Sequence, residues 1–153
     1  MALNAFDLTK QCYYLYRRPR RLPVDLLVIH HSWTYDLNSC LRAFKRAGNS
    51  SHFAINRQGA IYQLLPLDCY GAHCVGYNKN SVGVDLIRGE GQEILDVQYR
   101  ALNELIAFCV DNWHWSAAVL NENHVFYHRA LRNTSCPGTV DDSKIIVPNK
   151  EFT

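Results

Sequence analysis

The residue types best suited to metal chemistry lie in two parts of the chain. His128 and Cys136 are close together in the sequence, and His30 or its neighbour His31 follows an early apolar run. Catalytic zinc usually takes three protein ligands of the His, Cys or carboxylate type and keeps a further position for water. His30, His128 and Cys136 are a sufficient set, so the residues favour a metal-dependent hydrolase. A closed structural zinc site normally needs a fourth protein ligand, and the chain has no Cys-x-x-Cys pair.

Length and composition predict one ordinary domain, expected to be a monomer. The 153 residues are 48% hydrophobic, which is enough to bury a core, and the six cysteines are expected to be mostly reduced thiols. The net charge of +2 is too small to indicate nucleic-acid binding. Residues 1–25 contain no apolar stretch long enough for a signal peptide or a transmembrane segment, so synthesis in the cytoplasm is expected.

The first 25 residues differ in composition from the rest. They mix tyrosines with the arginines Arg17, Arg18, Arg20 and Arg21, which predicts a basic and aromatic N-terminal arm over residues 1–25, followed by a single domain over residues 26–153. Such an arm is suited to electrostatic contact with an anionic cell envelope. The alternative is an ordinary solvated lead-in segment.

An apolar run over residues 26–29 predicts a buried strand that carries His30 and His31 at its end. Because consecutive side chains of a strand point to opposite faces, only one of these histidines faces a given site directly. A second strand is predicted over residues 81–87, and it places Asp85 among apolar residues. A carboxylate in such a strand must be paired, hydrogen-bonded or functional.

Other patterns predict the remaining elements. Residues 52–65 form a β-hairpin with Gly59 in its turn, and residues 38–47 and 96–113 form helices capped by Asn38 and Asp96. Short apolar pieces lead to His128, and residues 141–146 form a last helical turn. Strands and helices interleave without regular alternation, which predicts an α/β fold with a mixed central β-sheet and helices packed on it.

Five motifs occur in the order found in zinc N-acetylmuramoyl-L-alanine amidases. They are Val28–Ser32, Ser51–Gly59, Gly71–Asn78, Asn80–Val84, and His128-Arg129 with Thr134–Gly138. Over residues 26–138 the chain therefore resembles the type 2 amidase family, which includes phage lysozymes and animal peptidoglycan recognition proteins. The resemblance implies one catalytic Zn²⁺ held by His30, His128 and Cys136. It also implies hydrolysis of the amide bond between N-acetylmuramic acid and L-alanine in bacterial peptidoglycan.

The resemblance also implies roles for residues around the metal. Thr134 matches a threonine of the catalytic recognition proteins and is expected to donate to the developing oxyanion. Asp85 stands where some bacterial amidases have a glutamate base, so it either takes the proton of the attacking water or orients a metal ligand. His73 and Asn78 match a loop that lines the substrate groove, and they are expected to contact substrate.

One position departs from the family pattern. Ser51, assigned here to substrate binding, stands where many relatives have a tyrosine, and a serine cannot supply a phenol to the tetrahedral intermediate. His52 is expected to be structural, and His31 is expected to point away from the metal.

Three functions follow from this resemblance. The first is a phage-type endolysin, made in the host cytoplasm and acting on the cell wall after release. The second is a peptidoglycan-binding or regulatory protein without catalysis, which Ser51 favours and the intact metal ligands oppose. The third is a cytosolic amidase that recycles soluble muropeptides, which the basic arm disfavours.

Overall fold

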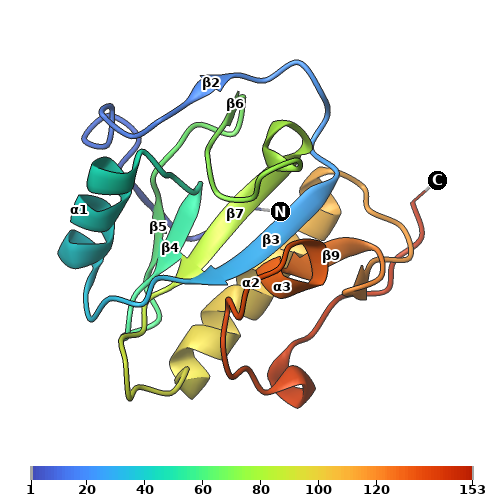
Figure 1. Cartoon of the computed structure of the whole chain (residues 1–153). Helices are drawn as coiled ribbons and strands as arrows, with labels where there is room; N and C mark the ends of the chain where they lie inside the picture. Colours follow the sequence, from blue (N-terminus) through green and yellow to red (C-terminus); the bar gives the residue numbers. More distant parts are fainter. Residues whose placement is uncertain (1, 153) are drawn as a thin grey trace.

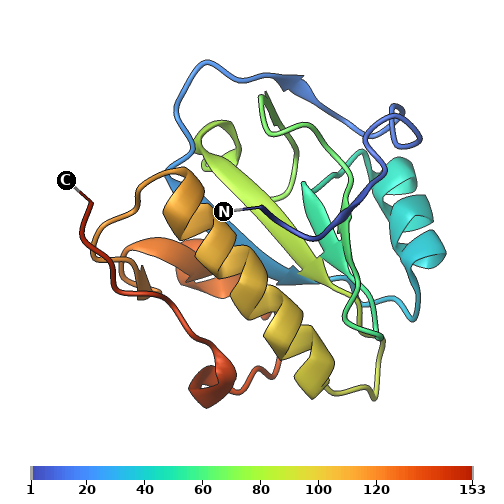
Figure 2. The ribbon, with the colours of Figure 1, turned by 180° about the vertical axis from the view of Figure 1, so that it is seen from behind.

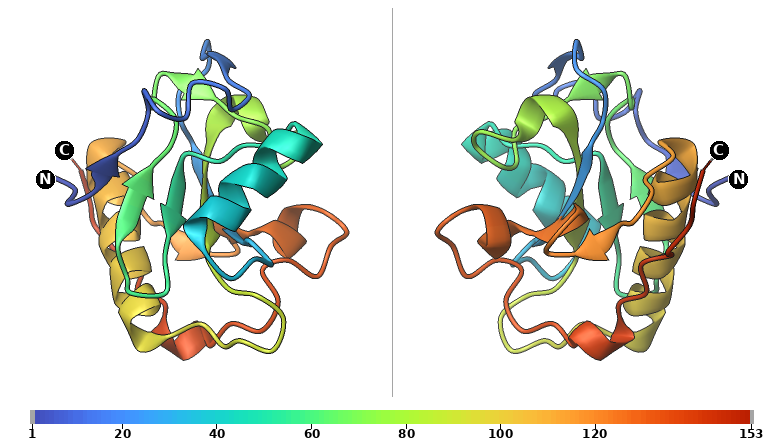
Figure 3. Two further views of the ribbon diagram at one scale, coloured as in Figure 1. Left: turned by 90° about the vertical axis from the view of Figure 1, so that its left-hand side faces the viewer. Right: turned by 90° about the vertical axis from the view of Figure 1, so that its right-hand side faces the viewer.

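A seven-stranded sheet lies between helices on its two faces, in a computed structural model that describes residues 2–152 (Figures 1 and 3). Met1 of the predicted arm and Thr153 of the predicted domain lie outside the described residues. The elements, in chain order, are β1 (Phe6–Asp7), β2 (Arg18–Pro19), β3 (Leu26–His31), α1 (Leu37–Ala47), β4 (Phe53–Ile55), β5 (Ile61–Gln63), β6 (Cys69–Tyr70), η1 (Asn78–Asn80), β7 (Ser81–Leu86), α2 (Asp96–Asn112), β8 (Val119–Leu120), β9 (His124–Tyr127), α3 (His128–Leu131) and η2 (Asp142–Lys144). This architecture confirms the predicted mixed α/β fold.

The sheet has the strand order β1-β5-β4-β7-β3-β9-β8. Its centre is parallel, because β3 pairs in parallel with both β7 and β9, and β4 pairs in parallel with β7. The antiparallel pair is β4 with β5, which is the predicted hairpin, and Gly59 takes a φ of 80° in its turn. The carboxyl ends of β3, β7 and β9 therefore meet at one edge of the sheet.

Alternation along the central strands divides their side chains between two layers. Leu27 and Ile29 of β3 and Val84 of β7 join the core beneath α2, which runs across one face of the sheet (Figure 2). His30 directly follows Ile29, and Asp85 directly follows Val84. Because side chains alternate along a strand, both therefore point to the opposite face of the sheet, on which α1 lies (Figure 3). The larger core thus leaves the α1 face available for polar groups.

The predicted helices form, but each begins differently from its prediction. The side chain of Asp36, and not of Asn38, caps α1 by accepting a hydrogen bond of 2.7 Å from the Ser39 amide. Asp96 is the first residue of α2 rather than its cap. The fully buried Gln98 closes that end instead, because its Oε1 accepts from the Leu95 amide at 3.0 Å and its Nε2 donates to the Ile87 carbonyl at 2.8 Å. Gln98 thereby joins α2 to the end of β7.

The predicted N-terminal arm packs on the rest of the chain. β1 extends the main sheet by pairing in parallel with β5, and β2 pairs with β6 in a second, two-stranded sheet. Cys12 and Leu15 are buried in a small core with residues of α1 and the sheet. Arg20 donates to the carbonyls of Leu67, Cys69, Lys79 and Ser81 at 2.8–3.1 Å. This arginine therefore anchors the arm rather than contributing a free charge.

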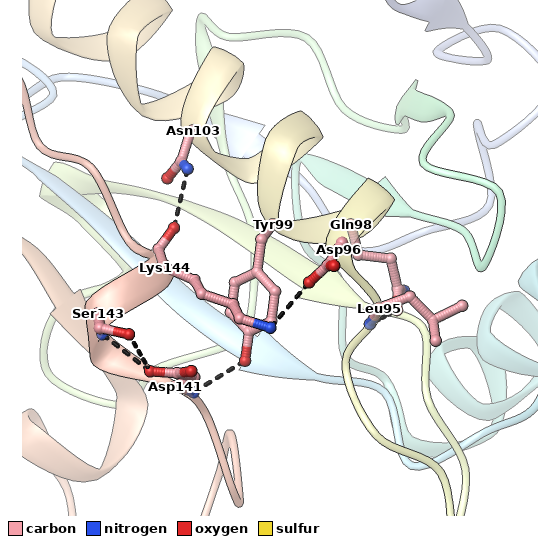
Figure 4. A network of polar contacts seen from close by, with 8 residues as sticks. All are labelled: Leu95, Asp96, Gln98, Tyr99, Asn103, Asp141, Ser143 and Lys144. Atoms are coloured by element: carbon pink, nitrogen blue, oxygen red, sulfur yellow. Dashed lines mark hydrogen bonds and ion pairs between the residues drawn. The ribbon is translucent and has the colours of Figure 1, made fainter.

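The C-terminal segment is fixed to α2 by polar contacts (Figure 4). Lys144 donates to Asp96 at 2.8 Å, and its carbonyl accepts from Asn103 at 2.9 Å. The Asp141 amide donates to the Tyr99 hydroxyl at 2.8 Å. The predicted last helical turn over residues 141–146 is the shorter 3₁₀ turn η2. Within residues 2–152, none of the helices combines the length and apolarity that a membrane crossing requires.

Candidate metal centre and active site

Three parallel strands each place one functional side chain at the shared carboxyl edge. His30 lies near the end of β3, Asp85 lies near the end of β7, and His128 directly follows β9 as the first residue of α3. Cys136 reaches the same place from the loop after α3, where the His31 amide donates to its Sγ at 3.4 Å. Residues from distant parts of the sequence thus meet because of the sheet topology.

The three predicted metal ligands lie together. His30 Nδ1 is 3.2 Å from His128 Nδ1 and 3.7 Å from Cys136 Sγ, and all three ligand atoms lie within 4.8 Å of one another. Tetrahedral zinc with bonds of about 2.05 Å to nitrogen and about 2.3 Å to sulfur would separate two nitrogens by about 3.3 Å, and nitrogen from sulfur by about 3.6 Å. The distances from His30 to His128 and to Cys136 therefore match those expected around a zinc ion.

The protonation of these groups also suits a metal. Burial lowers the pKa of His30 to about 3, with help from His128 and His31, and burial also lowers the pKa of His128. Both imidazoles are therefore neutral near pH 7 and offer a lone pair. Burial raises the pKa of the Cys136 thiol to about 12. A divalent cation deprotonates a thiol that coordinates it, so zinc is a suitable partner for this buried group.

Asp85 is the carboxyl group of the site. It is only 5% exposed, and burial raises its pKa to about 7 against the opposing effect of the Ser51 hydroxyl. It pairs with His30 in the β3–β7 register, so the two side chains lie next to each other on one face. A carboxyl group with a pKa near neutrality is suited to both accepting and releasing a proton.

A cavity of about 530 Å³ opens over these groups. Its walls come from α1, from the loop over residues 72–78 and from the segment after α3, and Asp85 and the three metal-ligand candidates also line it. Thr134 lies in the lining, where its Oγ1 accepts a hydrogen bond of 3.2 Å from the Cys136 amide. The Thr134 hydroxyl hydrogen is therefore available to a molecule in the cavity.

Comparison with known families gives this arrangement a context. Residues 20–139 match the family model described as N-acetylmuramoyl-L-alanine amidase. This chain belongs to that family. The match includes the metal-ligand candidates, Asp85 and Thr134, and it begins within the predicted N-terminal arm.

Individual relatives of this amidase-family chain are found in animals and phages. Peptidoglycan-recognition protein LB of Drosophila melanogaster is 30% identical in an alignment of 132 residues that covers 76% of this chain and 55% of the relative. The chain thus spans about half the length of that relative. The endolysin of the Thermus scotoductus MAT2119 bacteriophage Ph2119 superposes with a TM-score of 0.73 at 21% identity, covering 90% of this chain and 93% of the other. A mutant of Drosophila PGRP-LB in complex with tracheal cytotoxin gives a TM-score of 0.61 at 28% identity, covering 80% of each chain.

The two loop residues expected to contact substrate also have contacts within the amidase domain. His73 lines the cavity, and its Nδ1 lies 2.9 Å from His30 Nε2. Asn78 also lines the cavity, but its Oδ1 accepts from the amides of His73 and Cys74 at 2.9 and 2.8 Å. Asn78 therefore shapes the loop that holds His73.

Ser51 lies beneath the cavity rather than in its wall. It is fully buried, and its hydroxyl donates to the Phe53 carbonyl at 3.1 Å. This placement corrects the expectation of a direct substrate contact, because a residue with no exposed surface cannot touch a ligand. His52 is also fully buried, as expected of a structural residue: its Nδ1 accepts from the Gly83 amide at 3.1 Å and its Nε2 donates to the Cys69 carbonyl at 2.7 Å.

Arg88 is a residue of the site that sequence reasoning missed. It is 6% exposed, and it donates to His31 Nδ1 at 3.1 Å and to the Pro137 carbonyl at 3.1 Å. Arg88 thereby links the strand that carries His30 to the residue after Cys136. The side chain of His31 contacts Arg88 and is not one of the three candidate metal ligands. A charged residue directly after the apolar pair Leu86-Ile87 is the sequence signal that would have indicated it.

Trp33 is a second missed residue. Its side chain is 53% exposed at the rim of the cavity, and its backbone adopts a φ of 55°, which is uncommon for a bulky residue. The Arg88 guanidinium lies 5.6 Å from the centre of its ring. No pattern in the sequence around Ser32 and Thr34 predicts this conformation.

Proposed function

We propose that this domain hydrolyses the amide bond between N-acetylmuramic acid and L-alanine in peptidoglycan. The observation that carries the proposal is that Asp85 and the three candidate zinc ligands line one open cavity in a member of the amidase family. A structural metal site does not need a proton-transfer group beside an open cavity. A hydrolase needs both.

His30, His128 and Cys136 would hold the zinc ion. When bound, zinc supplies Lewis acidity, which polarises the amide carbonyl and makes a water molecule acidic near neutral pH. The His31 amide contributes by donating to Cys136 Sγ, because that hydrogen bond stabilises the thiolate form.

Asp85 would act as the proton-transfer group. Its carboxylate accepts the proton of the attacking water, and the protonated carboxyl then donates to the amine of the departing L-alanine. The pKa of about 7 that burial imposes on Asp85 suits both steps at physiological pH. Its fixed place beside His30 directs its side chain to the metal side of the cavity.

Thr134 would stabilise the developing oxyanion. Its Oγ1 already accepts the Cys136 amide, so the hydroxyl hydrogen is the part that can donate to substrate. Ser51 has no exposed surface and does not line the cavity, so Thr134 and not Ser51 is placed to offer a hydroxyl there.

Mass spectrometry of purified peptidoglycan tests the activity. After incubation with zinc-loaded protein, free L-alanine amino termini and glycan without peptides are expected, and both should disappear after chelation and return when zinc is restored. Asp85→Asn protein loaded with zinc is the matched control, because it keeps the metal ligands. Absence of cleavage by the zinc-loaded wild-type protein, with peptidoglycan still bound, would replace the amidase by a binding protein.

We further propose that the domain acts on the intact cell wall as a lysis enzyme and that the arm contacts the anionic envelope. Arg18, Arg21 and Lys79 are exposed around a pocket of about 300 Å³ beside β2 and β6, which supports an anionic partner for the arm. Binding to isolated cell walls should weaken as salt increases, and it should weaken in Arg18→Gln/Arg21→Gln protein. Preference for soluble muropeptides over intact walls would favour a recycling amidase instead.

A further inference from the structure

We propose that His73 is a positioning residue that fixes the imidazole of His30 for zinc binding, rather than primarily a contact for substrate. This inference rests on the proposed zinc site. It concerns a role that follows from hydrogen bonds within the chain and not from the cavity lining.

The direction of each hydrogen bond follows from the metal geometry. His30 Nδ1 faces His128 Nδ1 and Cys136 Sγ, so it is the nitrogen that offers its lone pair to a metal. A neutral imidazole with a metal at Nδ1 carries its proton at Nε2. The Nε2–H of His30 therefore donates to His73 Nδ1, which lies 2.9 Å away.

His73 is in turn limited to one tautomer. Because its Nδ1 accepts from His30, its proton is at Nε2, and that N–H donates to Ser81 Oγ at 3.2 Å. Ser81 is fully buried at the start of β7. The series from Ser81 through His73 to His30 thus leaves a single arrangement in which the His30 lone pair points at the metal position.

The backbone around His73 holds its ring in place. Asn78 Oδ1 accepts from the His73 amide at 2.9 Å and fixes the loop. The ring lies against Gly83 of β7, where a Cβ would come within 2.8 Å of His73 Nδ1. The rings of His30 and His73 are nearly perpendicular, at 88°. A glycine at position 83 therefore provides the space that lets His73 reach His30.

Metal-ligating histidines usually donate their second N–H to a carboxylate, a carbonyl or water, and loss of that partner typically weakens metal affinity by about 10- to 100-fold. Here a neutral imidazole takes that place. His73 thereby supports His30 without adding a negative charge to a site that already contains the Cys136 thiol and Asp85.

The test compares zinc affinity, by chelator competition, in wild-type, His73→Ala and His73→Asn proteins. His73→Ala should bind zinc about 10- to 100-fold more weakly, whereas His73→Asn, whose Oδ1 keeps an acceptor near the position of Nδ1, should recover most of the affinity. His114→Ala, which removes an exposed histidine outside the cavity lining, should leave zinc affinity unchanged. Circular dichroism checks that each variant is folded.

Two further readouts separate positioning from substrate contact. In ¹⁵N-histidine NMR spectra of the metal-free protein, His30 should be the Nε2–H tautomer in wild type and a mixture in His73→Ala. At saturating zinc, the KM of His73→Ala for peptidoglycan should stay near that of wild type. Unchanged zinc affinity in His73→Ala, or equal weakening in His73→Ala and His73→Asn, would overturn the proposal, as would a change in KM alone.

These outcomes also separate this proposal from the proposed function. Failure of the wild-type protein to bind zinc would overturn both. Zinc binding without hydrolysis of peptidoglycan would overturn the amidase activity alone, because the affinity comparison would still decide the role of His73.

Discussion

His30 and Asp85 are paired directly across the neighbouring parallel strands β3 and β7. Adjacent strands lie about 4.8 Å apart, so a hydrogen-bonded ladder, and not a loop, sets the separation between the candidate metal ligand and the carboxyl group. β7 is buried along its whole length, and β3 is buried up to His30. The candidate metal ligand His30 and the carboxyl group of Asp85 are therefore held by two paired, buried strands.

Replacement of the sulfur ligand should remove both zinc and activity. Cys136→Ser substitutes a hydroxyl for the thiolate, which weakens zinc binding and should abolish detectable turnover. Cys69→Ser is the matched control, because this half-buried thiol lies in β6 outside the cavity lining. Zinc content by elemental analysis and hydrolysis of peptidoglycan are the measurements. Full activity in Cys136→Ser would refute the assignment of the ligand.

Removal of the carboxyl charge at position 85 should slow hydrolysis without releasing the metal. Asp85→Asn should reduce kcat by at least about a hundredfold, because it keeps the side-chain shape but cannot accept the proton of water. Asp68→Asn, at an exposed aspartate outside the cavity lining, should leave kcat unchanged. A near-normal rate in zinc-loaded Asp85→Asn would leave Asp85 with an orienting role only.

The pH profile should report the same group. Because Asp85 must be deprotonated to accept a proton and burial raises its pKa to about 7, kcat/KM should fall as the pH decreases below that value. A nearby zinc ion favours the carboxylate and moves this fall to lower pH. The acidic limb should be lost in Asp85→Asn, measured on the residual rate. An unchanged limb would assign it to another group.

The sequence predicted the strands that form the site better than it predicted the contacts between those strands. The apolar runs that carry His30 and Asp85 have the clear signature of buried strands, so their existence and the faces of their side chains were predictable. Ordered motifs named the three residues that the structure brings together as candidate metal ligands. Which strands are neighbours depends on non-local pairing, and therefore the direct pairing of His30 with Asp85 was not predictable from local pattern.

The errors have physical causes of the same kind. Ser51 was assigned by its place in a motif, but burial is decided by packing of the whole hairpin on β7. The contact of His73 with His30 depends on space above Gly83, which appears only when the loop and the strand are folded together. The helix caps were predicted wrongly because the actual capping residues, Asp36 and Gln98, lie two positions from Asn38 and Asp96, whose side chains are equally able to cap a helix.

Gly138 should be the most sensitive glycine near the site. Its φ is 75°, and a Cβ added there would clash with Arg88 Nη2. Gly138→Ala should therefore destabilise the fold by about 2 kcal/mol or more, since strain in the left-handed region adds to displacement of Arg88. Gly48→Ala is a matched control: its φ is 71° but nothing lies within 4 Å of the added Cβ, so a loss of about 1 kcal/mol is expected.

Urea unfolding of the two glycine variants gives these free energies. Zinc affinity should fall in Gly138→Ala as well, because Arg88 holds the Pro137 carbonyl next to the proposed ligand Cys136, and it should be unchanged in Gly48→Ala. Equal loss of stability in both variants would show that Arg88 adjusts without cost and does not support the segment that carries Cys136.

Acid should destabilise the metal-free protein partly through His52. Burial lowers the pKa of His52 to about 3 from 6.5, and therefore between these values the unfolded chain binds a proton that the folded chain excludes. Its contribution is complete above pH 6.5 and is lost as the pH falls, by roughly 1.4 kcal/mol for each pH unit. His52→Gln keeps a donor for the Cys69 carbonyl but cannot titrate, so its stability should depend less steeply on pH.

Urea unfolding in the presence of chelator at about pH 7 and about pH 5 should show wild type losing roughly 2 kcal/mol more than the variant. The remaining loss belongs to the other buried histidines, including His30, whose pKa burial also lowers to about 3. Parallel curves for the two proteins would mean that His52 is protonated equally in the folded and unfolded states, which its buried contacts with Gly83 and Cys69 oppose.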